Sequence, residues 1–213
     1  MHLIGMLDSP YVRRVAVSLQ LMGLPFEHES VSVFRQMERF RALNPVIKAP
    51  TLVCEDGLVL MDSGLILDHA ESLQEAVRSL MPADAGERRQ ALRVIGLALA
   101  ACEKSVQILY ETQLRPLDKQ HMPWVERVTE QMLTAYRLLE AELQKQPLAA
   151  GSATITQAGV CAAVVWHFTQ SVQPGLVRPE DFPALRDFSA AAEALPEFRR
   201  APHGDSTYRA GAN

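Results

Sequence analysis

Ser9 and Pro10 stand where an apolar run, His2–Met6, meets a segment with helical periodicity. Serine is favoured at a helix N-cap and proline at the first helical position, so the dipeptide predicts a helix start. The simplest interpretation is a structural cap. The same hydroxyl could also donate a hydrogen bond to an anion, because the N-terminus of a helix favours negative charge. Ser9 is therefore the first candidate for chemistry.

Pro50 lies in the segment Lys48–Leu52, just before a short apolar run that predicts a strand. One interpretation is a plain loop that enters this strand. The other is a cis Ala49–Pro50 bond, although only about 5% of X-Pro bonds in folded proteins are cis. A cis bond would turn the N–H and C=O of Ala49 toward an extended, peptide-like ligand, which could pair with them as a strand does.

Two polar residues, Asp62 and Ser63, precede another apolar helical segment that contains Leu65 and Ile66. Aspartate and serine at this place can be plain capping residues. In the functional interpretation, the helix N-terminus and the Ser63 hydroxyl hold a carboxylate, and Asp62 holds an ammonium. The γ-glutamyl end of glutathione carries both groups on one carbon and would fit this pair.

Other polar residues are weaker candidates. Tyr11 lies two residues into the predicted helix, where packing between domains is the simpler role. Arg13 and Arg14 could bind anions, although we expect a structural ion pair for at least one of them. His69 lies among apolar helical neighbours, as core histidines do. No group of His and Cys residues has the spacing of a metal site, so we expect no metal.

Short apolar runs alternate with turn signals in the first part of the chain, which must position these candidates. Periodicity, capping residues and breakers predict the element order β-α-β-α-β-β-α. The first crossover makes a parallel strand pair, and the hairpin around Gly57 adds an antiparallel pair. The predicted strands are His2–Met6, Pro25–Val33, Thr51–Cys54 and Leu58–Met61. The predicted helices begin at Pro10, Phe34 and Ser63, and the first two are expected to end at Gly23 and at Asn44-Pro45.

The rest of the chain is rich in Ala, Leu, Glu and Gln and has helical periodicity. It predicts helices at about 87–115, 123–145, 156–170 and 184–194, with a possible last turn after Pro196. The segment 81–86 has the composition of a linker. We therefore expect two domains, 1–80 and an all-helical 87–213. The polar, glycine-containing tail from His203 onward is expected to be frayed.

The 213 residues carry a formal net charge of −4, and 48% of them are hydrophobic. A globular composition without a basic excess argues against nucleic acid as a partner. Three scattered cysteines without a CxxC pair predict buried thiols in a reducing compartment. The N-terminus lacks the pattern of a signal peptide and no apolar stretch would span a membrane, so we expect no membrane partner and a cytoplasmic protein.

The predicted element order of the first part resembles a thioredoxin-like fold. The expected fold class is therefore α/β plus all-α: an N-terminal thioredoxin-like βαβαββα domain and a C-terminal helical bundle. In this fold, glutaredoxins carry a Cys-Pro-Tyr-Cys motif at the turn after the first strand. Ser9 and Val12 stand at the two cysteine positions. This disfavours a dithiol oxidoreductase and leaves a turn with the shape for a thiol substrate.

The strings DSPYVRRV, LNPVIKAPTL and LMDSGLILDH, in this order and spacing, resemble the N-terminal domain of the glutathione S-transferase family. The string ITQAGV resembles the usual start of helix 6 in that family. The resemblance is greatest to bacterial members with an activating serine, and it implies that Ser9 activates the thiol of glutathione, the co-substrate. The implied glutathione contacts are Ala49, Pro50, Asp62 and Ser63, together with Lys48, and Gln36 near the glycyl carboxylate.

The resemblance implies a homodimeric glutathione transferase whose thiolate attacks a small, hydrophobic electrophile. Gln107, Tyr110 and Glu111 are candidates for lining the electrophile's pocket. Two alternatives remain open. One is a glutathione-dependent isomerase, dehalogenase or peroxidase that uses the same thiolate. The other is a non-catalytic protein-interaction module, because a fold does not fix a function.

Two positions depart from the family pattern. Asp62 stands where the family usually has Glu, and the shorter side chain draws the carboxylate back from the γ-glutamyl ammonium. Gly159 stands where an Asp usually completes a capping box with Thr156. We therefore expect the substitution Gly159→Asp to stabilise the chain by about 1–2 kcal/mol.

Overall fold

The structure is a computed structural model that describes residues 1–73 and 77–208. Its contacts divide the chain into two compact units. Unit 1 consists of Met1–Met81, Gly151–Thr154 and the described part of Glu193–Asn213, and unit 2 consists of Pro82–Ala150 and Ile155–Ala192. The sequence prediction assigned all residues after 86 to the helical part, whereas here the chain returns twice to unit 1.

Unit 1 is built on a four-stranded sheet with the strand order β2-β1-β3-β4. The parallel pair β1–β2 and the antiparallel hairpin β3–β4 are those predicted from the sequence, and β1 and β3 are also antiparallel. The edge strand β2 has the sequence Glu-His-Glu, of which only His28 is buried. The strands are β1 (His2–Ile4), β2 (Glu27–Glu29), β3 (Thr51–Val53) and β4 (Val59–Met61).

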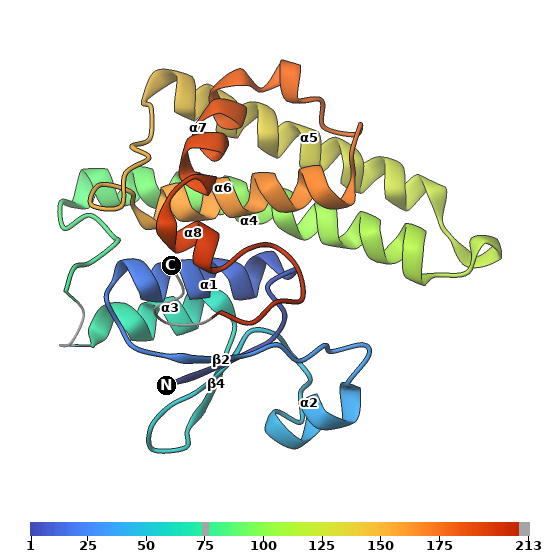
Figure 1. The fold of residues 1–213 in the computed structure, drawn as a ribbon. Helices are drawn as coiled ribbons and strands as arrows, with labels where there is room; N and C mark the ends of the chain where they lie inside the picture. Colours follow the sequence, from blue (N-terminus) through green and yellow to red (C-terminus); the bar gives the residue numbers. More distant parts are fainter. Residues whose placement is uncertain (74–76, 209–213) are drawn as a thin grey trace. The chain divides into compact units, whose positions relative to one another are not determined.

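Three helices flank this sheet, namely α1 (Pro10–Leu21), α2 (Met37–Leu43) and α3 (Ser63–Ser72). Helices α1 and α3 cover one face of the sheet, and α2 lies on the other (Figure 1). Phe40 of α2 packs there against Ile4 and Val31, all three fully buried. The two faces of the sheet are therefore both covered within unit 1, as a buried β1 requires.

Helix α1 forms where the apolar residues recur at helical spacing. Val12, Val15, Ala16 and Leu19 are all fully buried. The helix is followed by Gly23, whose φ of +72° lies in the region that favours glycine. The start and the end predicted from local signals are therefore both present.

The chain returns to unit 1 near its C-terminal end through α8 (Pro196–Arg200), which packs against α1. Arg13 of α1 is 2% exposed and donates two hydrogen bonds of 2.6 Å to the carboxylate of Glu193. Its Nε also donates to the carbonyl of Ala201 at 2.7 Å. Arg13 and Glu193 thus form the structural ion pair that the sequence predicts for at least one of Arg13 and Arg14.

The tail after α8 lies along β2, so the prediction of a frayed end from His203 is wrong for residues 203–208. The Tyr208 ring stacks on Phe26 with centroids 4.5 Å apart. The Tyr208 N–H donates to Nδ1 of His28 at 2.9 Å, and the Ser30 hydroxyl donates to the carbonyl of Asp205 at 2.9 Å. These contacts cover a strand edge that would otherwise be open. Residues 209–213 lie outside the described residues.

Unit 2 is helical, and its main helices match the predicted ones to within a few residues. Helix α4 packs against both α5 and α6. Among the described residues, no helix combines the length and the apolar character needed to cross a membrane. The elements are α4 (Ala85–Leu109), the π-helical turn η1 (Tyr110–Leu114), η2 (Leu117–Lys119), α5 (Met122–Lys145), α6 (Gln157–Val172), η3 (Pro179–Asp181) and α7 (Pro183–Glu193).

The start of α7 is capped by a side chain from another helix. Glu140 of α5 is 5% exposed, and its two oxygens accept the backbone N–H groups of Ala184 and Leu185 at 2.9 Å each. Gln144 donates a third hydrogen bond of 2.9 Å to the same carboxylate. This carboxylate satisfies N–H groups that a helix start leaves without an intrahelical partner.

The start of α6 contradicts the expectation for Gly159. A β-carbon placed on Gly159 would lie 2.8 Å from Cγ1 of Ile155 and 3.1 Å from Cζ of Phe188. Both neighbours would have to move to admit an aspartate, and overpacking of this kind costs about 1–3 kcal/mol. Thr156 has the backbone geometry of an N-cap, but its side chain forms no capping hydrogen bond. The space that the predicted capping box needs is filled by apolar side chains.

Candidate functional site

Pairing within the sheet brings the candidate segments to one end of unit 1. Ile4 at the end of β1 pairs with Thr51 at the start of β3, and Thr51 pairs with Met61 at the end of β4. Ile4 also pairs with Glu29 at the end of β2. The loops next to these four residues therefore meet at the same end of the sheet (Figure 1). They carry Ser9, Gln36, Lys48, Ala49, Pro50, Asp62 and Ser63.

Ser9 is the half-buried N-cap of α1, with φ −71° and ψ 121°. Its Oγ accepts a hydrogen bond from the Val12 N–H at 3.4 Å. A hydroxyl that accepts one hydrogen bond still has its own hydrogen to donate. The predicted structural cap and the predicted donor are therefore compatible in this residue.

The Ala49–Pro50 peptide bond is cis. Pro50 is buried, Ala49 is half-buried, and Lys48 and Gln36 are exposed. Within residues 1–73 and 77–208, the Lys48 ammonium forms no hydrogen bond or ion pair, so it can meet a carboxylate. The Oε1 of Gln36 accepts the Ser32 N–H at 3.1 Å, which leaves the amide NH2 of Gln36 as a donor.

A buried asparagine holds the loop before Pro50. The side chain of Asn44 donates to Oγ1 of Thr51 at 2.8 Å and accepts the N–H of Val46 at 3.0 Å. The Thr51 hydroxyl in turn donates to the carbonyl of Lys48 at 2.7 Å. The sequence predicted Asn44 only as the end of a helix, because these partners depend on how the loop folds back.

Asp62 is the N-cap of α3 and has φ 74°, a rare value for a residue other than glycine. Its Oδ1 accepts the N–H groups of Gly64 at 2.8 Å and of Leu65 at 3.4 Å. The second carboxylate oxygen has no partner among the described residues, and the side chain is exposed. Backbone strain of this kind is concentrated at functional sites, and the free oxygen can accept from an ammonium.

Ser63 is supported by a residue that the sequence did not assign to the site. The Ser63 side chain is 4% exposed, and its Oγ accepts a hydrogen bond of 3.1 Å from Nη1 of Arg14. Arg14 is 3% exposed, its Nε has no hydrogen-bond partner, and it forms no ion pair within the described part of the chain. The Ser63 hydroxyl can therefore donate outward, with an uncompensated positive charge behind it.

The negative charge of Asp8, next to Ser9, is partly balanced by the guanidinium of Arg35. Desolvation raises the pKa of the Asp8 carboxyl above its ordinary value, while the backbone N–H of Ser9 and the charge of Arg35 act in the opposite direction. The charged form of Asp8 is thus disfavoured at this place. Arg35 also lies 3.5 Å from the carboxylate of Asp205 in the tail. The nearby carboxylates therefore face a guanidinium.

Cys54 is the partly exposed thiol of unit 1 and could be a rival nucleophile. Desolvation and the nearby Asp56 raise the pKa of its thiol, and its Sγ lies 3.9 Å from Nε2 of His69. A thiol with a raised pKa is a poor nucleophile at neutral pH. The described residues contain no group of three or more His, Cys, Asp or Glu residues that could hold a metal ion.

The candidates for the electrophile's pocket, Gln107, Tyr110 and Glu111, lie in unit 2, and Gln107 and Glu111 form hydrogen bonds with neighbouring residues. Glu111 is 7% exposed and accepts hydrogen bonds of 2.8 Å from Nε of Arg115 and from the N–H of His121. Gln107 donates to Glu103 at 2.8 Å. Glu111 thus stabilises the turn that follows α4, whereas Tyr110 is exposed.

The chain matches two family models. The model "Glutathione S-transferase, N-terminal domain" matches residues 3–78, and "Glutathione S-transferase, C-terminal domain" matches residues 122–191. The first match contains all candidate residues at the end of the sheet in unit 1. The second covers all of α5 and α6 and all but the last two residues of α7.

Similar proteins include the uncharacterized GST-like protein YibF of Escherichia coli (strain K12). It is 26% identical over 175 residues, which are 82% of this chain and 86% of YibF. A solved glutathione S-transferase from Methylobacterium radiotolerans, in complex with glutathione sulfonate, has a TM-score of 0.85 and 26% identity, covering 94% of this chain and 93% of the other. A glutathione transferase family member from Pseudomonas fluorescens Pf-5 with bound glutathione has a TM-score of 0.77 and 26% identity, covering 93% and 96%.

Proposed function

Because the chain belongs to the glutathione S-transferase family, we propose that it is a glutathione transferase that activates the glutathione thiol for attack on a small, hydrophobic electrophile. One observation carries the proposal: the Ile4–Thr51–Met61 register brings three candidate loops to one end of the sheet. The relatives with glutathione or glutathione sulfonate bound support the same ligand.

The γ-glutamyl end of glutathione is anchored at the start of α3. Its carboxylate meets the helix N-terminus and the Ser63 hydroxyl, with the Arg14 charge behind them. Its ammonium meets the free oxygen of Asp62. The pair therefore recognises a group that carries both charges on one carbon.

The rest of glutathione lies along the loop before β3. The backbone of Ala49, next to Pro50, pairs with the cysteinyl unit as a neighbouring strand does. The glycyl carboxylate is met by the Lys48 ammonium and the Gln36 amide, both exposed. These contacts fix the position of the thiol at Ser9.

Ser9 lowers the pKa of the thiol by donating a hydrogen bond to the thiolate. A free thiol has a pKa of about 8.5, and lowering it by two units takes about 2.7 kcal/mol. A hydrogen bond to a charged acceptor contributes about 1.5–3 kcal/mol, and the N-terminus of α1 adds about 0.3–1 kcal/mol. Together these two contributions are large enough.

In the proposed reaction the thiol proton goes to solvent and the thiolate electron pair forms a bond to an electrophilic carbon. Where that carbon carries a leaving group, the leaving group departs with the electrons of its bond. Ser9 stabilises the anion before attack and forms no covalent bond to the substrate. The protein therefore acts by binding, orienting and shifting a proton equilibrium.

We also infer a cytoplasmic homodimer. The family resemblance supports it, as do apolar side chains exposed on unit 1, such as Val46, Leu58 and Leu65. Sedimentation velocity at micromolar concentration should give about twice the mass of one chain. A single species with the mass of one chain would contradict the dimer.

Ligand-induced stabilisation tests the function. A ligand that binds only the folded state stabilises it by about 2.7 kcal/mol at a hundredfold excess over Kd. Millimolar glutathione should therefore raise the Tm of the wild type. The rise should fall sharply in Asp62→Asn, which can keep the cap through its amide oxygen but loses the charge that meets the ammonium. It should largely persist in Ser9→Ala, because Ser9 acts on the thiol.

Titration of the thiolate absorbance of bound glutathione completes the test. The thiol pKa should be higher in Ser9→Ala than in the wild type. An unchanged pKa would contradict the role of Ser9, and a wild type whose Tm does not respond to glutathione would contradict the function itself.

A further inference from the structure

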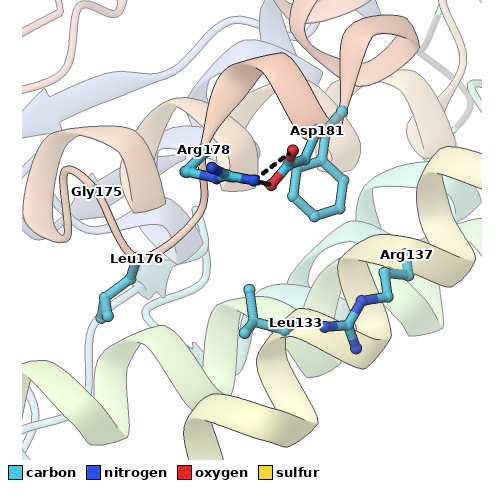
Figure 2. Close-up of a pocket in the computed structure, with 7 residues that line it drawn as sticks. Leu133, Arg137, Gly175, Leu176, Arg178 and Asp181 are labelled. Carbon is cyan, nitrogen blue, oxygen red and sulfur yellow. Dashed lines mark hydrogen bonds and ion pairs between the residues drawn. The ribbon is translucent and has the colours of Figure 1, made fainter.

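A cavity of about 440 Å³ lies within unit 2, and none of its lining residues is one proposed to bind glutathione. One side is formed by α5, through Leu133 and Arg137, which are four residues apart and lie on one face of the helix. The other side is formed by the segment after α6 and by η3 (Figure 2). This volume lies within the range of about 300–1,000 Å³ that ligand sites have. The lining residues are Leu133, Arg137, Gly175, Leu176, Arg178, Asp181 and Phe182.

The segment that forms the second side is fixed to the body of unit 2. The buried Gln173 donates to the carbonyl of Ser105 in α4 at 2.6 Å, and Gln170 of α6 donates to the carbonyl of Val177 at 3.0 Å. Val177 is fully buried. Gly175 makes the turn between these anchors, with φ +95°. The segment that forms this side of the cavity is therefore fixed by hydrogen bonds on both sides of its turn.

The two guanidinium groups of the cavity differ. Arg178 donates two hydrogen bonds of 2.9 Å to the Asp181 carboxylate, as the dashed lines in Figure 2 mark. The Arg137 side chain is exposed and has no hydrogen bond or ion pair within residues 1–73 and 77–208. Glu140, one turn further along α5, is already used by the start of α7. The lining thus carries one uncompensated positive charge.

We propose that this cavity binds a small amphipathic monocarboxylate. The apolar body packs against Leu133, Leu176 and Phe182, and the carboxylate pairs with Arg137. A planar carboxylate matches the fork of a guanidinium with two parallel hydrogen bonds. A dianion such as a phosphate ester is disfavoured, because Arg178 is already neutralised and Asp181 would repel the second charge. The site takes its ligand independently of the proposed transferase activity.

Isothermal titration of the full chain with 2-naphthoate tests the proposal, with 2-naphthamide as the uncharged compound of the same shape. The wild type should bind 2-naphthoate about tenfold more tightly than 2-naphthamide, since hydrogen bonds between a guanidinium and a carboxylate are stronger than those to a neutral amide. Arg137→Gln should remove this preference. Arg127→Gln is the matched control, since it removes another exposed arginine of α5 that does not line the cavity.

A second variant and a competition measurement complete the design. Leu176→Asp places a negative charge in the wall and should abolish 2-naphthoate binding. Excess glutathione should leave the 2-naphthoate Kd unchanged. The proposal is overturned by no measurable binding to the wild type, by equal affinity of Arg137→Gln and Arg127→Gln for 2-naphthoate, or by displacement with glutathione, which would place the ligand in unit 1.

Discussion

The starts of α7 and α3 are each capped by a carboxylate, and they differ in how many of its oxygens remain without a hydrogen bond. At the start of α7, both oxygens of Glu140 are used and the side chain is buried. At the start of α3, Asp62 uses one oxygen and is exposed, and the next residue, Ser63, accepts a hydrogen bond from a buried arginine, Arg14, that forms no ion pair among the described residues. We call the first cap closed and the second open. A closed cap stabilises the fold, whereas an open one retains hydrogen bonds for a ligand.

The closed cap should give the largest effect on stability. Glu140→Ala leaves the Ala184 and Leu185 N–H groups without their acceptor in a buried place, so it should lower the free energy of unfolding by about 3 kcal/mol. Urea titration followed by circular dichroism measures this loss. Glu140→Gln keeps one acceptor oxygen and should lose less.

Glutathione affinity distinguishes the role of the closed cap at Glu140, in stability, from that of the open cap at Asp62, in binding. If the closed cap is purely structural, the glutathione Kd of folded Glu140→Gln should equal that of the wild type. If folded Glu140→Gln bound glutathione more weakly than the wild type, the distinction between the two caps would be wrong.

The open cap should give the next effect, on affinity rather than on stability. Ser63→Ala and Arg14→Gln should each weaken glutathione binding, by about tenfold for the loss of the hydroxyl donor. Because Arg14 acts through Ser63, the double variant should bind glutathione no more weakly than the single variant with the lower affinity. Arg14→Lys should have a higher glutathione affinity than Arg14→Gln. Isothermal titration measures all four Kd values.

The neighbouring arginine provides the control for this experiment. Arg13→Gln breaks a complete ion pair with Glu193, so it should lower the Tm while the folded protein keeps its glutathione affinity. Additive effects of Ser63→Ala and Arg14→Gln on binding would show that Arg14 acts by another route.

The smallest effect concerns His28, whose two ring nitrogens are both used. Nδ1 accepts the Tyr208 N–H, so Nε2 carries the proton and donates to the carbonyl of Gly5 at 2.7 Å. Burial lowers the pKa of His28 below its ordinary value, with His2 acting in the same direction and Gly5 and Glu29 against it. The folded chain therefore binds this proton less tightly than the unfolded chain.

The stability that neutral His28 contributes is complete above its unfolded pKa of about 6.5 and is lost as the pH falls toward the lower pKa of the folded state. The Tm difference between pH 8 and pH 5.5 should therefore be smaller in His28→Gln than in the wild type. Glutathione binding should not change, since both ring nitrogens of His28, like both carboxylate oxygens of Glu140, already have hydrogen-bond partners within the protein. An equal Tm difference in both proteins would contradict this role.

Much of the fold and part of the proposed site could be predicted from local patterns. The Ser9 and Asp62 caps, the order of the strands and helices, and the end of α1 all depend on interactions within a few residues. The sequence also indicated which residue types could hold glutathione. It could not indicate that Asp62 keeps one oxygen free or that Ser32 engages Gln36, because these depend on the path of the backbone.

The contacts that separate structural from available groups join distant residues. Arg14 and Ser63 are 49 positions apart, Glu140 and Ala184 are 44 apart, and Arg13 and Glu193 are 180 apart. The sequence treated Arg13 and Arg14 alike, predicted a frayed tail and expected room for an aspartate at Gly159. Hydrogen-bonding capacity and periodicity are properties of single residues and short segments, so the sequence by itself determined the elements and the candidate chemistry. Which polar groups are already satisfied, and which space is already filled, is decided by packing between elements, and only the tertiary structure contains it.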